Sequence, residues 1–328
     1  MINIISISFV YIFILIFVIY LSKKLNFVDK PNSRKIHSNK IVNTGGIAIY
    51  FFLVLMVIQN EFSFEIENII VIGFIVLLTG FLDDRFDLSP SVKLILLMFP
   101  SVYLIFNGFL LNNLGTYELI GNIELGKFGL IFTFLAVGLL INAYNYIDGI
   151  DGLLLGNSTT AIVYISFLNI SPEVDKLLIY FLICFIINLF FNLLSEKNYF
   201  KIYLGDAGSL FIGFFFSFLL IYMYLYQKIH PVYLMWACWY PVYDFLYVTF
   251  DRIKKKKKFY QPDNIHFHHY IFRKFQGSQI KTFVSINILN IIIILNGYFI
   301  AVIIGKIYSL IFFLLLFIMF FYIKKKIA

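Results

Sequence analysis

The sequence predicts an all-α, polytopic integral membrane protein, and three observations support that fold class. Of its 328 residues, 61% are hydrophobic and only 13% are charged, and the mean hydropathy is +0.89. A soluble globular domain of this length is not so apolar. Apolar runs recur along the whole chain, and the basic residues gather in alternate breaks between those runs.

The apolar runs predict about eleven transmembrane helices. A bilayer core of roughly 30 Å needs about 17 to 25 helical residues per crossing, and fewer where protein covers the segment. The first run is followed by Lys23 and Lys24 and has no basic residue before it, which indicates a retained helix and not a cleaved signal peptide. We expect spans near residues 4–21, 45–59, 68–82, 92–110, 128–146, 153–170, 177–194, 207–226, 231–250, 282–304 and 307–323.

The basic residues predict the orientation of these spans. With the N-terminus outside, 22 of the 26 Lys and Arg residues fall in cytoplasmic breaks, as the positive-inside rule requires. The C-terminus is then cytoplasmic. Among the outer loops, TYELIGNIEL alternates around Gly121 and predicts a small hairpin. No linker, repeat or low-complexity segment divides the chain, so we expect residues 1–328 to form a single transmembrane helical domain.

Acidic residues beside the apolar runs are the main functional signal. An Asp at the centre of a membrane helix costs roughly 2.5 to 3.5 kcal/mol, and less near the interface, so such a residue suggests a site. Five aspartates lie at or beside the ends of these runs, in the clusters GFLDDRFD, NAYNYIDGIDGL and YLGDAGSL, and in the expected topology all face the cytoplasm: Asp83, Asp84, Asp148, Asp151 and Asp206. Together they predict one site for a metal ion and phosphate.

The first two clusters suit a hard divalent cation. The adjacent pair Asp83 and Asp84 can bind such a cation, position a phosphate through it, or act as a base, although a solvated helix end would look the same. Asn142, Asn145 and Asp148 recur every three residues and so share one helical stripe, which the glycines of DGIDG then interrupt. Oxygen ligands favour Mg²⁺, with Mn²⁺ as an alternative. Polar helix packing is the competing interpretation of this stripe.

The third cluster, YLGDAGSL, adds a helix start, and a fourth, PDNIHFHH, adds a histidine group. Asp206 precedes the eighth span, where it can cap the helix, but a helix N-terminus also suits phosphate. Three of the five histidines, His266, His268 and His269, follow Asp263 closely and can supply cations or proton carriers. A zinc site is the alternative. The lack of nearby cysteine and the abundance of oxygen ligands elsewhere favour magnesium.

The motifs, taken in order, resemble the polyprenyl-phosphate N-acetylhexosamine-1-phosphate transferases. The resemblance runs from about residue 29 to 270 through DKPNSRKIH with a following Gly pair, GFLDDRFDLSPSVK, NAYNYIDGIDGL, YLGDAGSL, PVYD and HFHH. It implies Mg²⁺-dependent transfer of a sugar 1-phosphate from a UDP-N-acetylhexosamine to undecaprenyl phosphate, with release of UMP. It also implies a multi-pass enzyme of the bacterial inner membrane whose active site faces the cytoplasm.

The resemblance also implies roles for individual residues. Asn145 and Asp206 would bind the metal, and the catalytic group would be Asp83, Asp84, Lys93, Asp148 and Asp151. Substrate contacts would come from seven further residues: Arg34, Lys35, Asn142, Asp263, His266, His268 and His269. One departure is Asn264, because related transferases commonly carry a basic residue after the equivalent of Asp263.

Several alternatives stay open at this point. The HFHH form resembles enzymes that use UDP-GlcNAc more than the phospho-MurNAc-pentapeptide translocase, so peptidoglycan precursor synthesis is the second interpretation. A cation-coupled transporter is a third, since intramembrane carboxylates also mark cation pathways. The product can feed lipopolysaccharide O-antigen, teichoic acid, capsule or glycoprotein assembly. The resemblance implies no nucleic-acid partner and is compatible with a homodimer.

Overall fold

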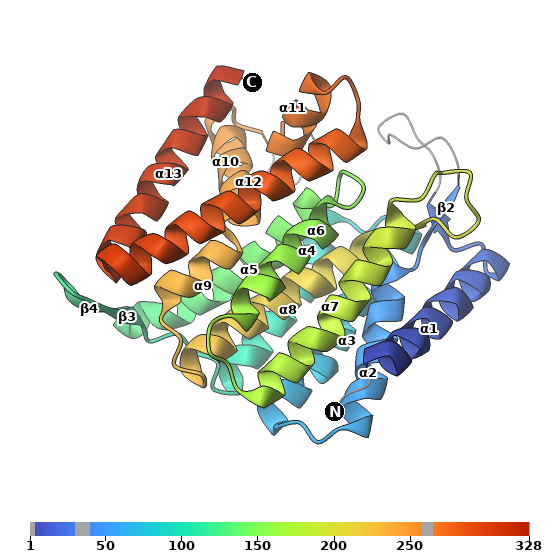
Figure 1. Cartoon of the computed structure of the whole chain (residues 1–328), viewed down its shortest axis with the longest axis horizontal. Coiled ribbons are helices and arrows are strands. Elements are labelled where there is room, and N and C mark those ends of the chain that lie inside the picture. Colours follow the sequence, from blue (N-terminus) through green and yellow to red (C-terminus); the bar gives the residue numbers. More distant parts are fainter. Residues whose placement is uncertain (1–3, 30–39, 258–264, 328) are drawn as a thin grey trace. The chain divides into compact units, whose positions relative to one another are not determined.

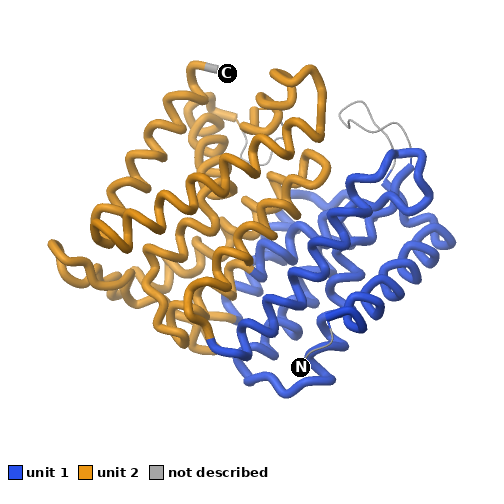
Figure 2. Tube along the Cα trace, in the orientation of Figure 1, with its two compact units in different colours: residues 1–103, 171–215 blue, residues 104–170, 216–328 orange. Residues whose placement is uncertain are grey.

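The computed structural model describes residues 4–29, 40–257 and 265–327, and within these ranges the chain is mainly helical (Figure 1). It divides into two compact units (Figure 2): unit 1 comprises residues 1–103 and 171–215, and unit 2 comprises residues 104–170 and 216–328. The chain passes from one unit to the other inside helices α4 (Pro90–Phe106) and α8 (Gly205–Leu225), and between Ile170 and Ser171. The single helical domain expected from the sequence stays a prediction.

Each predicted apolar run contains helix. Besides α4 and α8, the helices in these runs are α1 Ile4–Lys24, α2 Gly45–Gln59, α3 Phe64–Phe86, α5 Gly129–Ile147, α6 Leu153–Ser166, α7 Pro172–Asn192, α9 Pro231–Ala237, α10 Trp239–Lys254, α12 Gln279–Phe299 and α13 Lys306–Ile327. Among the described residues, seven helical segments are long and apolar enough to cross a membrane. The chain is therefore a helical membrane protein with several spans. The count of eleven and the orientation stay predictions.

The ninth predicted run is interrupted, which the apolar composition did not indicate. Residues 231–250 form two helices, α9 and α10, that meet at Cys238. Pro241 explains the break, because it has no N–H to bond the carbonyl of Ala237 four residues earlier. The helix instead restarts at Trp239, and α10 carries Asp244 in its second turn.

Unit 1 contains a small three-stranded sheet that the sequence did not predict. Its strands are β1 (Val28–Asp29), β2 (Ile41–Asn43) and β5 (Ile202–Tyr203), in the order β1-β2-β5. Strand β2 pairs with β5 in parallel, so that Asn43 lies opposite Tyr203. Because α8 begins two residues after β5, this pairing brings Asn43 next to the first turn of α8.

Glycines let α2 and α3 approach the same turn of α8 within unit 1. A Cβ atom built on Gly46 would lie 2.1 Å from the Cα of Gly208, and one built on Gly80 would lie 2.4 Å from the backbone nitrogen of Ala207. Only a residue without a side chain permits contacts this close. The Gly pair at the start of α2 and the GDAG motif therefore belong to one packing arrangement.

Unit 2 contains the predicted outer hairpin. Strands β3 (Asn113–Tyr117) and β4 (Gly121–Glu124) pair antiparallel, with Tyr117 opposite Gly121, which confirms the hairpin expected around Gly121. Between the strands, the Glu118 carboxylate accepts the N–H groups of Lys306 and Ile307 at 3.1 Å each, at the start of α13. This is a favourable position for a negative charge. The short helix α11 (Phe267–Lys274) packs against α12 in the same unit.

We expect Gly46→Ala to lower the stability of the protein by about 1 to 3 kcal/mol, because the added methyl group would overlap the Gly208 backbone. Gly138→Ala is the matched control: it also lies within a helix, and its Cβ would meet nothing within 4 Å. Thermal unfolding of the two purified variants in detergent, followed by intrinsic fluorescence, measures the difference. Equal unfolding midpoints for the two variants would contradict the packing argument.

Candidate active site

In unit 1, the side chain of Lys93 joins two of the predicted aspartates. Its Nζ lies 2.6 Å from Oδ2 of Asp83 and 2.6 Å from Oδ2 of Asp206. Asp83 comes from the last turn of α3, Lys93 from the beginning of α4 and Asp206 from the first turn of α8. The three side chains are partly exposed, with relative accessibilities of 14, 18 and 33% respectively. A molecule outside the protein can therefore reach them.

The turn between α3 and α4 holds Asp83 in this position. Asp87 adopts a left-handed conformation with φ of 52° and ends α3. Oδ1 of Asp83 accepts the N–H of Leu88 at 3.0 Å, while Oδ2 faces Lys93. Oδ1 of Asp83 therefore stabilises the turn, and Oδ2 contacts the ammonium group of Lys93.

Asp84 has a different environment from its neighbour Asp83. Its Oδ1 accepts a hydrogen bond from Nδ2 of Asn43 at 2.9 Å, and its Oδ2 accepts the N–H of Ala207 at 3.2 Å. A Cβ atom on Gly205, which has φ of +71°, would lie 2.5 Å from that same Oδ2. Asp84 therefore binds the N-terminus of α8 and occupies an N–H group that the sequence suggested for phosphate.

The donor set of this cluster fits a hard divalent cation. Asp83 and Asp206 already direct carboxylate oxygens at one positive group, the ammonium of Lys93. Carboxylate oxygens near a partly exposed surface are the ligands that Mg²⁺ uses when it also binds a substrate phosphate. Asp206 is the metal ligand predicted in this unit, and Asp83 is the carboxylate that shares the Lys93 ammonium with it.

In unit 2, the DGIDG turn separates α5 from α6 as the sequence predicted. Helix α5 ends at Ile147, and Gly152 has φ of +77° just before α6 begins. The side chain of Asn142 donates to the carbonyl of Gly138 in its own helix at 2.8 Å. The N–H of Asp151 binds Oε1 of Gln279 at 3.1 Å, which ties the turn to α12. Asn145 and Asp148 lie half-buried near the same end of α5.

The histidines of the HFHH motif lie against this turn. A Cβ atom on Gly149 would lie 2.9 Å from Nε2 of His268 and 3.4 Å from Cε1 of His269, so the absence of a side chain admits both rings. The rings of His266 and His268 stack with centroids 5.3 Å apart. Two clusters that the sequence identified separately are thus neighbours within unit 2.

The three imidazoles are not equivalent. His268 is fully buried, and burial lowers the pKa of its imidazole well below the usual value. Its ring is therefore neutral near neutral pH. His266 is 6% exposed and has a carboxylate partner, while His269 is half-buried. The motif therefore supplies a buried neutral ring (His268), a ring paired with a carboxylate (His266) and a half-buried ring (His269).

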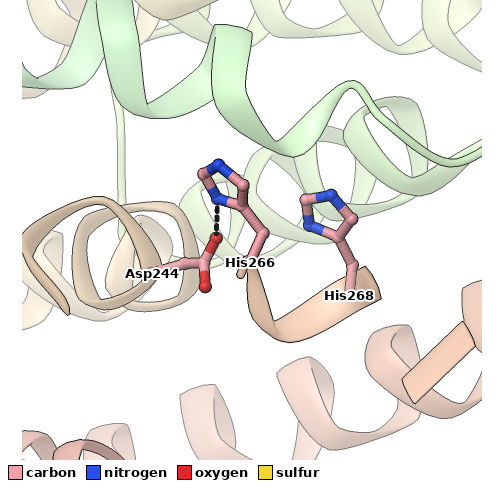
Figure 3. A group of neighbouring side chains, drawn as sticks. All are labelled: Asp244, His266 and His268. Carbon is pink, nitrogen blue, oxygen red and sulfur yellow. Dashed lines mark hydrogen bonds and ion pairs between the residues drawn. The ribbon is translucent and has the colours of Figure 1, made fainter. Parts of the chain in front are cut away.

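Asp244 of the PVYD motif is the carboxylate partner of His266 (Figure 3). It is fully buried in α10, and its Oδ2 lies 2.7 Å from Nδ1 of His266. Its Oδ1 accepts the N–H of Phe267 at 2.8 Å and a hydrogen bond from Nζ of Lys324 at 2.6 Å. Neither Asp244 nor Lys324 was predicted to belong to the site.

The contacts of Asp244, His266 and His268 bear on the zinc alternative. Asp244, His266 and His268 each offer one potential ligand atom, and the three atoms lie within 4.8 Å of one another (Figure 3). However, the Asp244 carboxylate already accepts three donors, one of which is the ammonium of Lys324. A cation next to that ammonium would be repelled, and Lys324 is buried, so its ammonium cannot turn towards solvent as that of the partly exposed Lys93 can. The contacts therefore favour a buried ion pair over a metal centre here.

Three predicted substrate-binding residues, Arg34, Lys35 and Asp263, lie outside the described residues, as does Asn264. Conversely, Asn43, Asp244 and Lys324 take part in the two clusters without having been predicted. For Asp244 a signal existed, since a carboxylate inside an apolar run is costly wherever it lies. No comparable signal distinguished Asn43 or Lys324.

Comparison with known proteins identifies the family. A family model described as glycosyl transferase family 4 matches residues 66–224, a range that contains Asp83, Lys93, the DGIDG turn and Asp206. Undecaprenyl-phosphate alpha-N-acetylglucosaminyl 1-phosphate transferase of Escherichia coli K12 is 31% identical over 270 residues, which cover 77% of this chain and 71% of that protein.

Relatives from other bacteria match to a similar extent. The probable undecaprenyl-phosphate N-acetylglucosaminyl 1-phosphate transferase of Bacillus subtilis is 31% identical over 258 residues, covering 75% of this chain and 70% of the relative. The undecaprenyl-phosphate alpha-N-acetylglucosaminyl 1-phosphate transferase of Salmonella typhi is 28% identical over 284 residues, covering 80% and 75%. With this identity and coverage, the chain belongs to glycosyl transferase family 4, the polyprenyl-phosphate N-acetylhexosamine-1-phosphate transferases that its motifs resemble, and it is a phosphotransferase enzyme.

Proposed function

We propose that the protein transfers a sugar 1-phosphate from a UDP-N-acetylhexosamine to undecaprenyl phosphate. An oxygen of the lipid phosphate attacks the phosphorus that carries the sugar. The bond from that phosphorus to the bridging oxygen breaks, and UMP leaves with the electron pair. The products are UMP and a lipid diphosphate that carries the sugar. The names of the relatives support the lipid acceptor and the N-acetylglucosaminyl 1-phosphate group.

The contact of Lys93 with both Asp83 and Asp206 is the observation that carries the proposal. Phosphoryl transfer between two anionic partners depends on positioning and on stabilisation of negative charge. An ammonium group held between two carboxylates can shift towards an incoming phosphate, and it then leaves a carboxylate to orient or deprotonate that phosphate. We assign Asp83 this role towards the acceptor, and Lys93 the stabilisation of charge.

Mg²⁺ is the proposed cofactor, with Mn²⁺ as an alternative. On the family resemblance, Asp206 and Asn145 would hold it. When bound, the ion neutralises the phosphate charge and orients the donor diphosphate. Asp84 supports this group indirectly, because its bonds to Asn43 and to the N–H of Ala207 fix the turn that carries Asp206.

In unit 2, we propose that the histidines contact the donor diphosphate or sugar. The DGIDG turn, which His268 and His269 touch, contributes Asp148 and Asp151 to nucleotide binding or to the metal site. Arg34, Lys35, Asn142 and Asp263 remain proposed substrate contacts on the family resemblance. Membership of a transferase family favours this enzyme over the cation-coupled transporter.

The proposed location is the bacterial inner membrane, with the active site on the cytoplasmic side. The distribution of Lys and Arg residues along the sequence supports this orientation. UDP-GlcNAc is the first candidate donor because of the relatives' names, and the choice among its deoxy and epimerised relatives is left to experiment. The glycan pathway that uses the product stays open.

We expect the purified protein in detergent to release UMP from UDP-GlcNAc or a related UDP-acetamido sugar, in the presence of undecaprenyl phosphate and Mg²⁺. A panel of donors that includes UDP-MurNAc-pentapeptide identifies the sugar, with UMP release and a lipid-linked product as the measurements. Omission of the lipid phosphate is the control. If no donor in the panel is turned over, the proposed reaction is wrong.

We expect Asp206→Asn to lower the rate by about 10²- to 10⁴-fold, because the variant keeps the shape of the side chain but loses the charge that would bind the metal. Asp87→Asn is the matched control, since Asp87 is exposed, lies near the same cluster and sits at a left-handed position that Asn tolerates. Rates measured over a series of Mg²⁺ concentrations compare the two. Full activity of Asp206→Asn would remove Asp206 from the metal site.

We expect Lys93→Gln to lose about 10²-fold or more in rate, because the two carboxylates would then lack their shared positive partner and would repel an incoming phosphate. Lys93→Arg keeps the charge and should retain part of the rate. The exposed Lys197 of the same unit provides the control Lys197→Gln. Similar rates for Lys93→Gln and Lys197→Gln would argue against a role of Lys93 in charge stabilisation.

A further inference from the structure

Three consecutive lysines near the end of α13 differ sharply in environment. Lys324 is buried, with a relative accessibility of 3%, whereas Lys325 and Lys326 are exposed. In the sequence the three formed one basic run at a cytoplasmic helix end. Burial of a single lysine from such a run is costly unless the ammonium gains a partner.

The partner of Lys324 is Asp244. Nζ lies 2.6 Å from Oδ1 of Asp244, which is fully buried, and 4.2 Å from the centre of the Tyr247 ring. Phe320 lies on another side, with its ring centre 5.7 Å from Nζ. The ion pair is thus enclosed by aromatic rings, where an electrostatic interaction is stronger than in water.

The same carboxylate connects Lys324 to the histidine motif. While Oδ1 receives Lys324 and the N–H of Phe267, Oδ2 receives Nδ1 of His266. A carboxylate that accepts from Nδ1 fixes the orientation of the imidazole and leaves Nε2 as the second functional nitrogen. The bond to Phe267 also fixes the first turn of α11, which carries the other two histidines.

Loss of the ammonium would change this arrangement. A buried carboxylate without a cation is disfavoured and would take up a proton. A protonated Asp244 could accept from fewer donors, so the bond to Nδ1 of His266 or the bond to the N–H of Phe267 would weaken. The orientation of the His266 ring therefore depends on a residue that need not contact the substrate itself.

We propose that Lys324 is a positioning residue of the active site: it pairs with the buried Asp244 carboxylate, which in turn orients His266 and the start of α11 for the donor substrate. The proposal rests on the function proposed above for the histidines. It assigns a role in the site to one lysine of the terminal basic run and none to its two neighbours.

The first test compares Lys324→Met with Lys325→Met and Lys326→Met, which remove the same charge at exposed positions. In the UMP-release assay, we expect Lys324→Met to reduce the rate about 10- to 100-fold, the loss typical of a group that orients a ligand. We expect both controls to stay within about twofold of the wild type, because isolated surface charges contribute little. Equal rates for all three variants would overturn the proposal.

A second test separates positioning from general stability. In a His266→Gln background, Lys324→Met should cause a smaller further loss of rate, because one of the two groups through which it acts is already absent. Lys324→Arg, which keeps the positive charge, should recover part of the rate. If Lys324→Met reduces the rate by the same factor with and without His266, the residue acts on folding alone and the proposal is wrong.

The double variant Asp244→Asn/Lys324→Met covers the case in which Lys324→Met does not fold, because it removes both charges and leaves no unpaired group. We expect it to fold, as judged by thermal unfolding in detergent, and to show the same low rate as Asp244→Asn. Wild-type activity in the double variant would contradict the proposal.

A measurement independent of activity distinguishes failure of this proposal from failure of the proposed reaction. Solid-state NMR of protein with ¹⁵N-labelled histidine reports the Nδ1 environment of His266, and the His266→Gln spectrum assigns its signal. We expect the signal to shift in Lys324→Met and to stay unchanged in Lys325→Met. An unshifted signal overturns the positioning role even if no donor is ever turned over.

Discussion

Asp244 is fully buried, and its carboxylate receives donors from three directions: an imidazole, a backbone N–H and an ammonium group. Much of the polar structure in unit 2 follows from this arrangement. Because an unpaired charge among apolar helices is costly, each partner has to be present, and removal of one partner of a buried pair costs about 3 to 5 kcal/mol. The same requirement holds in a milder form in unit 1, where Lys93 lies between two partly exposed carboxylates. The side chains there are partly exposed, whereas the buried Asp244 holds other groups in place.

Close backbone packing of α2 and α3 against α8 positions the carboxylates of unit 1. Gly46 and Gly80 allow α2 and α3 to touch the first turn of α8, and the short parallel pairing of β2 with β5 adds Asn43 beside it. Asp84 then accepts from that turn and from Asn43, so that its neighbour Asp83 is held near Asp206. Adjacent aspartates thus have separate tasks. Asp84 binds the backbone of α8, and Asp83 faces the Lys93 ammonium.

Much of the fold could be predicted because helix formation in a membrane follows from local composition. Apolar runs predicted the helices, and Gly121 with its alternating flanks predicted the hairpin. The break at Cys238 was missed because composition does not register the N–H that Pro241 lacks. The strands of the small sheet were missed because they have two or three residues, too few to show an alternation of apolar and polar residues.

The candidate site, like the fold, could be predicted only in part. Carboxylates at the ends of apolar runs were recognisable, since their cost is a local property. Asp244 was not predicted as a site residue because it lies inside an apolar run rich in aromatic residues. The cost of placing a carboxylate there applied to it all the same. Asn43 and Lys324 became visible only with the fold, because their roles depend on partners 41 and 80 residues away.

The distance of Lys324 from Asp244 along the chain has a consequence for biosynthesis. Helix α10 is made before α13, so the Asp244 carboxylate leaves the ribosome 80 residues ahead of the lysine that pairs with it. Until then, burial of Asp244 among apolar helices would leave its charge unpaired, so the carboxylate has to stay in contact with water or remain protonated. Helix α13 then does more than add a span. Its Lys324 supplies the positive charge that lets the Asp244 carboxylate be buried.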